Sequence, residues 1–231
     1  MVEGKIVWTS QEPAVQARLV AEDFHIPIDL YPSGSGTLSE DYCKDHLEVA
    51  SRVTGEVTFD GKHYTIDGFG YRDHSWGERR WRTLLSHRWV TGVLSENCSF
   101  GAMSWHAEDN TLNIWAYMIR GDTVYYATEA DIVTFVEQDA LTHRGGIVYM
   151  TLPDGEKIEI TCSTVAPGAI SDNQGMYCND TICIARCGDL TGYCDFETSV
   201  NPTRGDLAPT LAMNSYLENG LFLAKDHPRN H

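Results

Sequence analysis

The stretch LNIWAYMI, residues Leu112–Ile119, alternates in character and is followed by the turn residues Gly121 and Asp122. The chain then resumes as the short β-prone run Thr123–Tyr126. Successive side chains of a strand point to opposite faces, so this pattern predicts two antiparallel strands joined by a tight turn.

Further segments of the chain have the same form. Val57–Ile66 predicts a hairpin with Asp60 and Gly61 at its turn, and Ile147–Cys162 predicts another with its turn at Pro153–Gly155. Other predicted strands are Trp89–Leu94, Ser99–Trp105, Thr181–Arg186 and Tyr193–Thr198. Strands that recur roughly every ten residues, with few helical windows, predict an all-β fold built as an antiparallel barrel or sandwich.

Helical signals are weak and lie near the ends. Asp41–Val53 is compatible with a turn or two of helix, and Leu207–Leu217 with a short terminal helix. Ser33–Gly36 (SGSG) is typical of a flexible joint. The expected divisions are a partial N-terminal β unit over residues 1–38, a main β domain over 39–205 and a tail over 206–231, whose end we expect to be disordered.

The composition narrows the range of partners. The net charge of -16 argues against nucleic acid and against an anionic membrane surface, and it favours neutral or cationic ligands. No stretch approaches the roughly twenty apolar residues of a membrane span. Met1–Lys5 contains Glu3 and lacks an apolar core, so we expect no signal peptide.

Seven cysteines occur, four of them between Cys178 and Cys194 with the spacing C-x4-C-x3-C-x6-C. A zinc ribbon needs two close C-x2-C pairs, which this spacing lacks. We therefore expect reduced, structural thiols and, with them, a cytoplasmic location. A disulfide or a metal in this cluster is the alternative.

The richest segment in chemical groups is Tyr71–Glu78 (YRDHSWGE), which lies between Ile66–Gly70 (IDGFG) and Arg79–Arg82 (RRWR). Charged and indole side chains crowded between glycines are typical of a rigid loop that directs polar groups at a ligand. A second interpretation is a buried Asp–Arg network that fixes a strand crossing. The sequence leaves both open.

Asp73 and His74 are the first candidates for catalysis. Neighbours in a strand point to opposite faces, so both reach one cavity only if the backbone turns there, as Gly70 and Gly77 would allow. An Asp beside an apolar ligand has a raised pKa and can donate a proton, whereas Arg72 or Arg79 nearby would hold it as a carboxylate. A structural His74 is the alternative to a catalytic one.

Aromatic residues occur throughout the predicted strands. They supply either core packing or the lining of a hydrophobic cavity, in which their faces can stabilise a carbocation. The histidines His87, His106 and His143 lie on separate strands or turns and could meet as metal ligands with Asp73 or Glu197, although no H-x-H or H-E-x-x-H spacing is present. Serine-nucleophile, phosphate-loop and dinucleotide motifs are missing from the sequence.

Gly68–Gly77 (GFGYRDHSWG) resembles a motif of the lipocalin-like, two-domain β proteins that include carotenoid 1,2-hydratase and AttH-type proteins. It is most similar to a bacterial branch with the sequence RDHSWG, and Gly188–Ser199 followed by Asn201–Pro202 resembles a second motif of that branch. The two motifs cover about residues 46 to 204. Arg72 stands where the hydratases have His, and Ser75 where they have Asn.

The resemblance implies a lipocalin-like fold and chemistry on isoprenoid-like or polyene molecules without a cofactor. The chain also looks shorter than the family, with much of the first β domain missing, and an incomplete sheet favours a homodimer. The residues expected in catalysis are Asp73, His74 and Arg72. The residues expected to bind substrate are Trp76, Arg79, Trp105, Trp115, Tyr117, His87 and Glu197.

Three functions follow from this reasoning. The first is a hydratase or cyclase in which Asp73 protonates an alkene and His74 orients it or relays protons. The second is a carrier of a hydrophobic small molecule, with the charged loop as a structural latch. The third is metal-assisted hydrolysis through His and carboxylate ligands.

Overall fold

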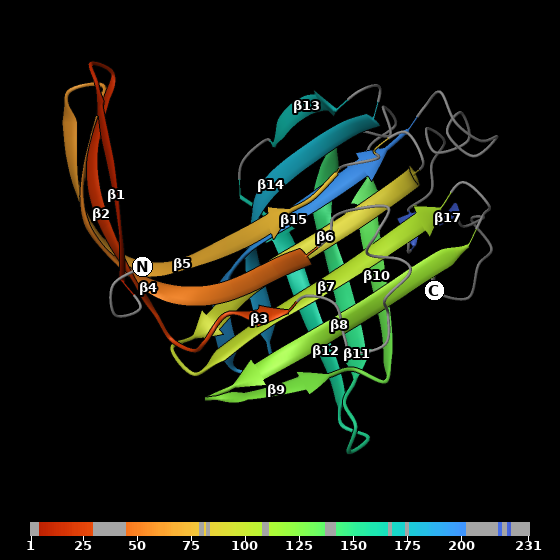
Figure 1. Cartoon of the computed structure of the whole chain (residues 1–231). Helices are drawn as coiled ribbons and strands as arrows, with labels where there is room; N and C mark the ends of the chain where they lie inside the picture. Colours follow the sequence, from red (N-terminus) through yellow and green to blue (C-terminus); the bar gives the residue numbers. More distant parts are fainter. Residues whose placement is uncertain are drawn as a thin grey trace.

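The chain is described by a computed structural model over residues 5–29, 45–78, 81, 84–107, 111–136, 142–165, 168–173, 176–201, 217–218 and 221–222. These residues form two antiparallel β-sheets and contain no α-helix, which confirms the predicted all-β fold (Figure 1). Over the same ranges, no helix long and apolar enough to cross a membrane is found.

The first sheet has five strands and reaches from a projecting ribbon to the body of the molecule. Its strands are β1 (Lys5–Glu12), β2 (Val15–Asp23), β3 (Ile28–Asp29), β4 (Asp45–Phe59) and β5 (Lys62–Trp76). In Figure 1, β1 and β2 project from the body at the left, and β4 and β5 bend from them to run across the second sheet. The long β4–β5 hairpin therefore belongs to both parts of the molecule.

The second sheet has twelve strands and is strongly curled (Figure 1). Its path runs β17-β16-β10-β11-β12-β14-β15-β6-β7-β8-β9, with β13 paired to β14. The strands are β6 (Leu84–Ser95), β7 (Cys98–Ala107), β8 (Leu112–Arg120), β9 (Thr123–Tyr126), β10 (Glu129–Val136), β11 (His143–Thr151), β12 (Lys157–Thr164), β13 (Ala169–Asn173), β14 (Met176–Cys187), β15 (Leu190–Val200), β16 (Leu217–Glu218) and β17 (Leu221–Phe222).

The three predicted hairpins are confirmed as β4–β5, β8–β9 and β11–β12. Asp60 and Gly61, at the first turn, have φ angles of 49° and 73°, which Gly and Asp tolerate best. The helical prediction for Asp41–Val53 is wrong from Asp45 onward, where β4 begins. The predicted helix at Leu207–Leu217 lies outside the described residues except for Leu217, which begins β16.

The chain passes from the first sheet to the second between β5 and β6. The first sheet thus continues well past residue 38, because β4 and β5 pair with each other and β4 pairs with β2. The divisions at residues 38 and 205 stay a prediction.

Two hydrophobic cores lie on opposite faces of the second sheet. On β8, Ala116 and Met118 belong to the core inside the curl, whereas Trp115, Tyr117 and Ile119 belong to a second core with Ile28 of the first sheet and residues of β6 and β7. Alternate side chains of a strand face opposite sides, so both faces of these strands are buried. The second face is closed because the first sheet covers it, and this second interface contains the candidate site.

Candidate active site

A cavity of about 620 Å³ lies between β5 of the first sheet and β6, β14 and β15 of the second. Four of its lining residues carry carboxyl groups and four carry aromatic rings, and none of the described lining residues is Lys or Arg. The carboxyl residues are Asp73, Asp180, Asp195 and Glu197, and the aromatic residues are Phe69, Tyr71, Trp89 and Tyr193. An apolar wall with a few converging polar groups is the usual form of a small-molecule site.

The strand register explains how three of the carboxyl residues meet. In the β14–β15 hairpin, Asp180 lies directly opposite Glu197, and Asp195 lies opposite Ile182. Residues directly opposite each other share a face, as do residues two apart along one strand. Asp180, Asp195 and Glu197 therefore stand together on the cavity side of the second sheet.

Two of these carboxyl groups hold their protons up to an unusually high pH. Burial, together with the charges of Asp180 and Glu197, raises the pKa of Asp195 to about 7. One buried oxygen of Asp195, Oδ1, accepts no hydrogen bond within the described part of the chain. Burial and the charge of Glu197 likewise raise the pKa of Asp180 to about 6. A pKa of about 7 means that Asp195 is protonated in a large fraction of the molecules at neutral pH and can then donate that proton.

Glu197 is the opposite case. Its burial favours the neutral form, but the charge of His87 and hydrogen bonds from His87, Cys178 and Ser199 outweigh burial and lower its pKa to about 2. Nδ1 of His87 lies 3.0 Å from Oε1 of Glu197, and Oγ of Ser199 donates to the same oxygen at 3.0 Å. Glu197 is therefore a carboxylate able to accept a proton.

A further carboxyl group, Glu48 of β4, lies behind the cavity wall and is fully buried. The hydroxyl of Tyr71 donates to Oε2 at 2.7 Å, the indole Nε1 of Trp89 donates to Oε1 at 2.8 Å, and the hydroxyl of Tyr117 also donates to Oε2. Burial raises the pKa of Glu48 to about 7 even though these three bonds favour the carboxylate. Room for the Tyr117 ring comes from Gly101, directly opposite on β7.

Asp73 faces the cavity, but the structure does not bring His74 or Arg72 to it. β5 pairs with β4 in unbroken register from Lys62 to Trp76, so no turn separates these neighbours. Asp73 lies opposite Glu48 on the side of the second sheet, and His74 faces away, exposed, with its ring edge-on to Trp76. Arg72 also faces away, and its guanidinium pairs with Asp23 of β2 at 3.0 Å.

The expected substrate-binding residues are divided between the cavity, the core and the surface. Glu197 lines the cavity, His87 is buried beside it, and Tyr117 contacts Glu48. Trp105 and Trp115 are buried in the second core. Trp76 is exposed, and Arg79 lies outside the described residues.

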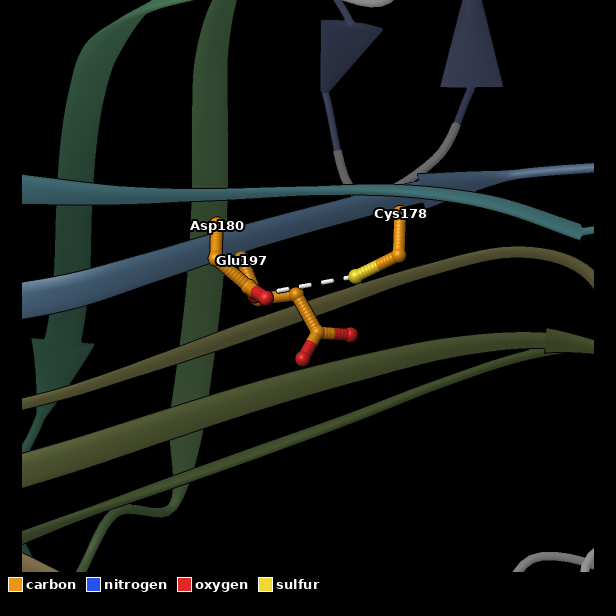
Figure 2. Close-up of side chains that lie close together, drawn as sticks. All are labelled: Cys178, Asp180 and Glu197. Carbon is orange, nitrogen blue, oxygen red and sulfur yellow. Dashed lines mark hydrogen bonds between the residues drawn. The ribbon is translucent and has the colours of Figure 1, made fainter. Parts of the chain in front are cut away.

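One group of side chains has the spacing to hold a metal ion. Ligand atoms of Cys178, Asp180 and Glu197 lie within 4.8 Å of one another, and Figure 2 shows the three converging. The Cys178 thiol donates to Oδ1 of Asp180 at 3.6 Å. A thiol, two carboxylates and the neighbouring His87 are ligand types that zinc accepts. The group does not include His106, which is buried, and the side chain of His143 is not described.

The described cysteines are free thiols, in agreement with the reduced state that the sequence predicts. Cys178, Cys183 and Cys194 are buried. Burial, together with the charge of Glu197, raises the pKa of the Cys178 thiol well above its usual value, so the thiol is neutral in this setting.

Several residues of the site were not predicted. The positions of Asp180 and Asp195 could have been predicted from the sequence. A two-residue turn at Gly188 and Asp189 fixes the register of β14 against β15, and this register places Asp180 beside Glu197. No feature of the sequence predicts that Glu48 belongs to the site, because only the docking of β4 on the second sheet buries it.

Comparison with known proteins places this fold. Among solved structures, a protein from Nitrosomonas europaea described as an AttH has a TM-score of 0.63 at 10% identity, covering 87% of this chain and 66% of that one. Kievitone hydratase from Nectria haematococca has a TM-score of 0.53 at 13% identity, covering 87% of this chain and 65% of that one. These TM-scores show a shared fold, and at such low identities they show the fold alone, which agrees with the lipocalin-like β fold expected from the sequence.

The chain spans just under two thirds of the length of both structures. No curated protein sequence matches it significantly. A family model, described as a domain of unknown function, matches residues 2–202. The chain therefore belongs to this family, DUF7064.

Proposed function

We propose that this protein is a hydratase-type enzyme that adds water to a carbon–carbon double bond of a hydrophobic small molecule held in the cavity between the sheets. The observation that carries the proposal is the large difference in pKa between two carboxyl groups, those of Asp195 and Glu197, on the same face of one strand. Asp195, with a pKa of about 7, and Glu197, with a pKa of about 2, stand two residues apart on β15. Two carboxyl groups whose surroundings move their pKa values apart are suited to act as acid and base.

The proposed step balances without an added reactant. Asp195 gives its proton to one alkene carbon and becomes a carboxylate, which leaves a carbocation on the other carbon. Glu197 takes a proton from a water molecule, whose oxygen bonds to the cation and forms an alcohol. Transfer of the proton from Glu197 to Asp195 restores both groups, and their Cα atoms are about 7 Å apart in an extended strand.

The aromatic residues support the same reaction. Trp89 and Tyr71 line the cavity, and an aromatic face stabilises a cation by about 0.5–2 kcal/mol. The absence of Lys and Arg from the described lining keeps positive charge away from a developing carbocation. The kievitone hydratase structure shares the fold and, by its name, is a hydratase. An isoprenoid-like or polyene substrate, action without a cofactor, a homodimer and a cytoplasmic location remain our predictions.

The test is turnover of alkenes in isotopically labelled water. A panel of isoprenoid and polyene compounds is incubated with the protein in H₂¹⁸O, and labelled alcohol is detected by mass spectrometry. Asp195→Asn should lower the rate by about 10²–10⁴-fold, because it removes the proton donor. The matched control is Asp122→Asn, because Asp122 is an exposed turn residue that does not line the cavity. Undiminished turnover by Asp195→Asn would rule out this assignment.

A second function, carriage of a hydrophobic small molecule without chemistry, is favoured by the Arg72–Asp23 pair. That pair joins β5 to β2 and gives the charged segment a structural role, as a latch would have. Native mass spectrometry of freshly purified protein tests it. A ligand that co-purifies stoichiometrically and is recovered unchanged after incubation supports a carrier, whereas conversion of that ligand supports the enzyme.

A further inference from the structure

The side chain of His46, on β4, lies between the buried carboxyl of Glu48 and the cavity carboxyl of Asp73. Its Nε2 is 3.7 Å from Oε1 of Glu48 and 3.9 Å from Oδ2 of Asp73. The register explains the arrangement, because Asp73 lies directly opposite Glu48 and His46 is two residues from Glu48 on the same face of β4. The histidine that the structure places beside Asp73 is therefore His46 and not His74.

The three side chains differ in their access to solvent. The side chain of Asp73 is 43% exposed and lines the cavity, that of His46 is 3% exposed, and that of Glu48 is fully buried. The imidazole of His46 is stacked on Trp89, with ring centroids 6.3 Å apart and an angle of 24° between the planes. The imidazole of His46 thus lies between the buried carboxyl of Glu48 and the carboxyl of Asp73, which solvent and a ligand can reach.

We propose that His46 is a proton-relay residue that exchanges protons between Glu48, behind the cavity wall, and Asp73, at the cavity. In the forward direction, protonated Glu48 gives its proton to Nε2 of neutral His46, which leaves a carboxylate and an imidazolium. The imidazolium then gives that proton to the carboxylate of Asp73 and returns to neutral. Both gaps exceed a hydrogen bond by about 1 Å, so a small swing of the ring closes one and then the other.

The relay rests on the proposed function in one respect, namely that the cavity uses protons. The charge of Asp73 contributes to the raised pKa of Asp195, so these two groups interact electrostatically across the cavity. Glu48 is then a store of protons that the relay delivers to Asp73, at the cavity. The groups that face Glu48 are His46 from its own strand, Tyr71 and Asp73 from β5, Trp89 from β6, Tyr117 from β8 and, by its electrostatic effect, Tyr126 from β9.

A pH jump tests the relay without any substrate. The indole of Trp89 donates to Glu48, so its fluorescence reports whether Glu48 is ionised. After rapid mixing from pH 5 to pH 9, the wild-type signal should change with one rate constant. Glu48→Gln and Trp89→Phe should each remove this change, which identifies the signal.

The relay is tested by His46→Gln, which keeps a polar side chain but cannot carry a proton. The rate constant should fall about 100-fold, and Asp73→Asn should slow it to a similar extent. Because His46 is buried, Asp73→Asn at a half-exposed site gives an independent result if His46→Gln does not fold. His63→Gln, on the exposed end of the hairpin, is the matched control and should leave the rate unchanged.

Two results overturn the relay. One is a wild-type rate constant in His46→Gln or, if that variant does not fold, in Asp73→Asn. The other is a slow phase that appears only in Tyr71→Phe, which would mean that protons leave through the tyrosine hydroxyl. Neither result bears on Asp195, whose role depends on turnover, so the relay and the proposed reaction can fail separately.

Discussion

Replacing Glu48 by Gln should remove a loss of stability that the wild-type protein undergoes as pH rises, because Glu48 is buried. Glu48 is fully buried, and its pKa is about 7 instead of 4.5. Below pH 4.5 the group is protonated in both the folded and the unfolded protein. Between pH 4.5 and about 7 the folded state keeps a proton that the unfolded state has lost, so stability falls as pH rises.

The size of the effect follows from that interval. The difference between 4.5 and about 7 corresponds to roughly 3 kcal/mol of unfolding free energy, lost by the wild type between those pH values and not regained above them. The Gln variant carries no charge at any pH, and its amide can accept from Trp89 or Tyr71 and donate to a tyrosine oxygen. The difference in stability between Glu48→Gln and wild type should therefore move by roughly 3 kcal/mol in favour of the variant from pH 4.5 to pH 8.

The assay is urea unfolding followed by circular dichroism at pH 4.5, 6, 7 and 8, with the two proteins compared at each pH. Subtraction removes the contributions of Asp180 and Asp195, which both proteins share. Glu56→Gln, an exposed residue of the same strand, should show a constant difference from wild type. A constant difference for Glu48→Gln as well would refute the reasoning, because it would mean that Glu48 is ionised normally in the folded protein.

Gly101→Ala should destabilise the protein by about 1–3 kcal/mol in urea unfolding, because the added Cβ would lie 2.5 Å from atoms of the Tyr117 ring. Gly68→Ala, whose Cβ meets nothing within 4 Å, should cost far less, and equal costs would contradict this account of Gly101. His87→Gln should raise the pKa of Glu197, since the charge and hydrogen bond of His87 are what hold it near 2. Carboxyl ¹³C NMR titration measures this directly, and an unmoved Glu197 titration would contradict the role assigned to His87.

Most of the fold could be predicted from local signals. Alternation in Leu112–Ile119 and glycine-containing turns such as Asp60–Gly61 are properties of short segments, and the structure contains the strands and hairpins that they predict. The first part of β4, before Val57, escaped prediction because its buried face includes His46 and Glu48, so its buried positions are not all apolar. Polar side chains that are buried only by tertiary contacts look, in the sequence, like a solvated segment.

The candidate site was predicted in part, for reasons that also lie in tertiary structure. Asp73 and Glu197 were expected and both line the cavity, whereas the expected neighbour His74 is on the other side of an unbroken strand. Whether the backbone turns after Asp73 depends on pairing with β4, which adjacent residues do not reveal. His46 is 27 residues earlier in the sequence and reaches Asp73 only through that pairing.

The β4–β5 hairpin supplies one wall of the cavity, while the second sheet supplies the other. The hairpin carries Asp73 and Tyr71, and it contributes nothing to the core inside the curl of the second sheet. Substitutions on the hairpin can therefore change the shape and charge that a ligand meets, while Asp195 and Glu197 on β15 keep the support of that core. The two walls are therefore supported separately, and a change in one wall need not disturb the other.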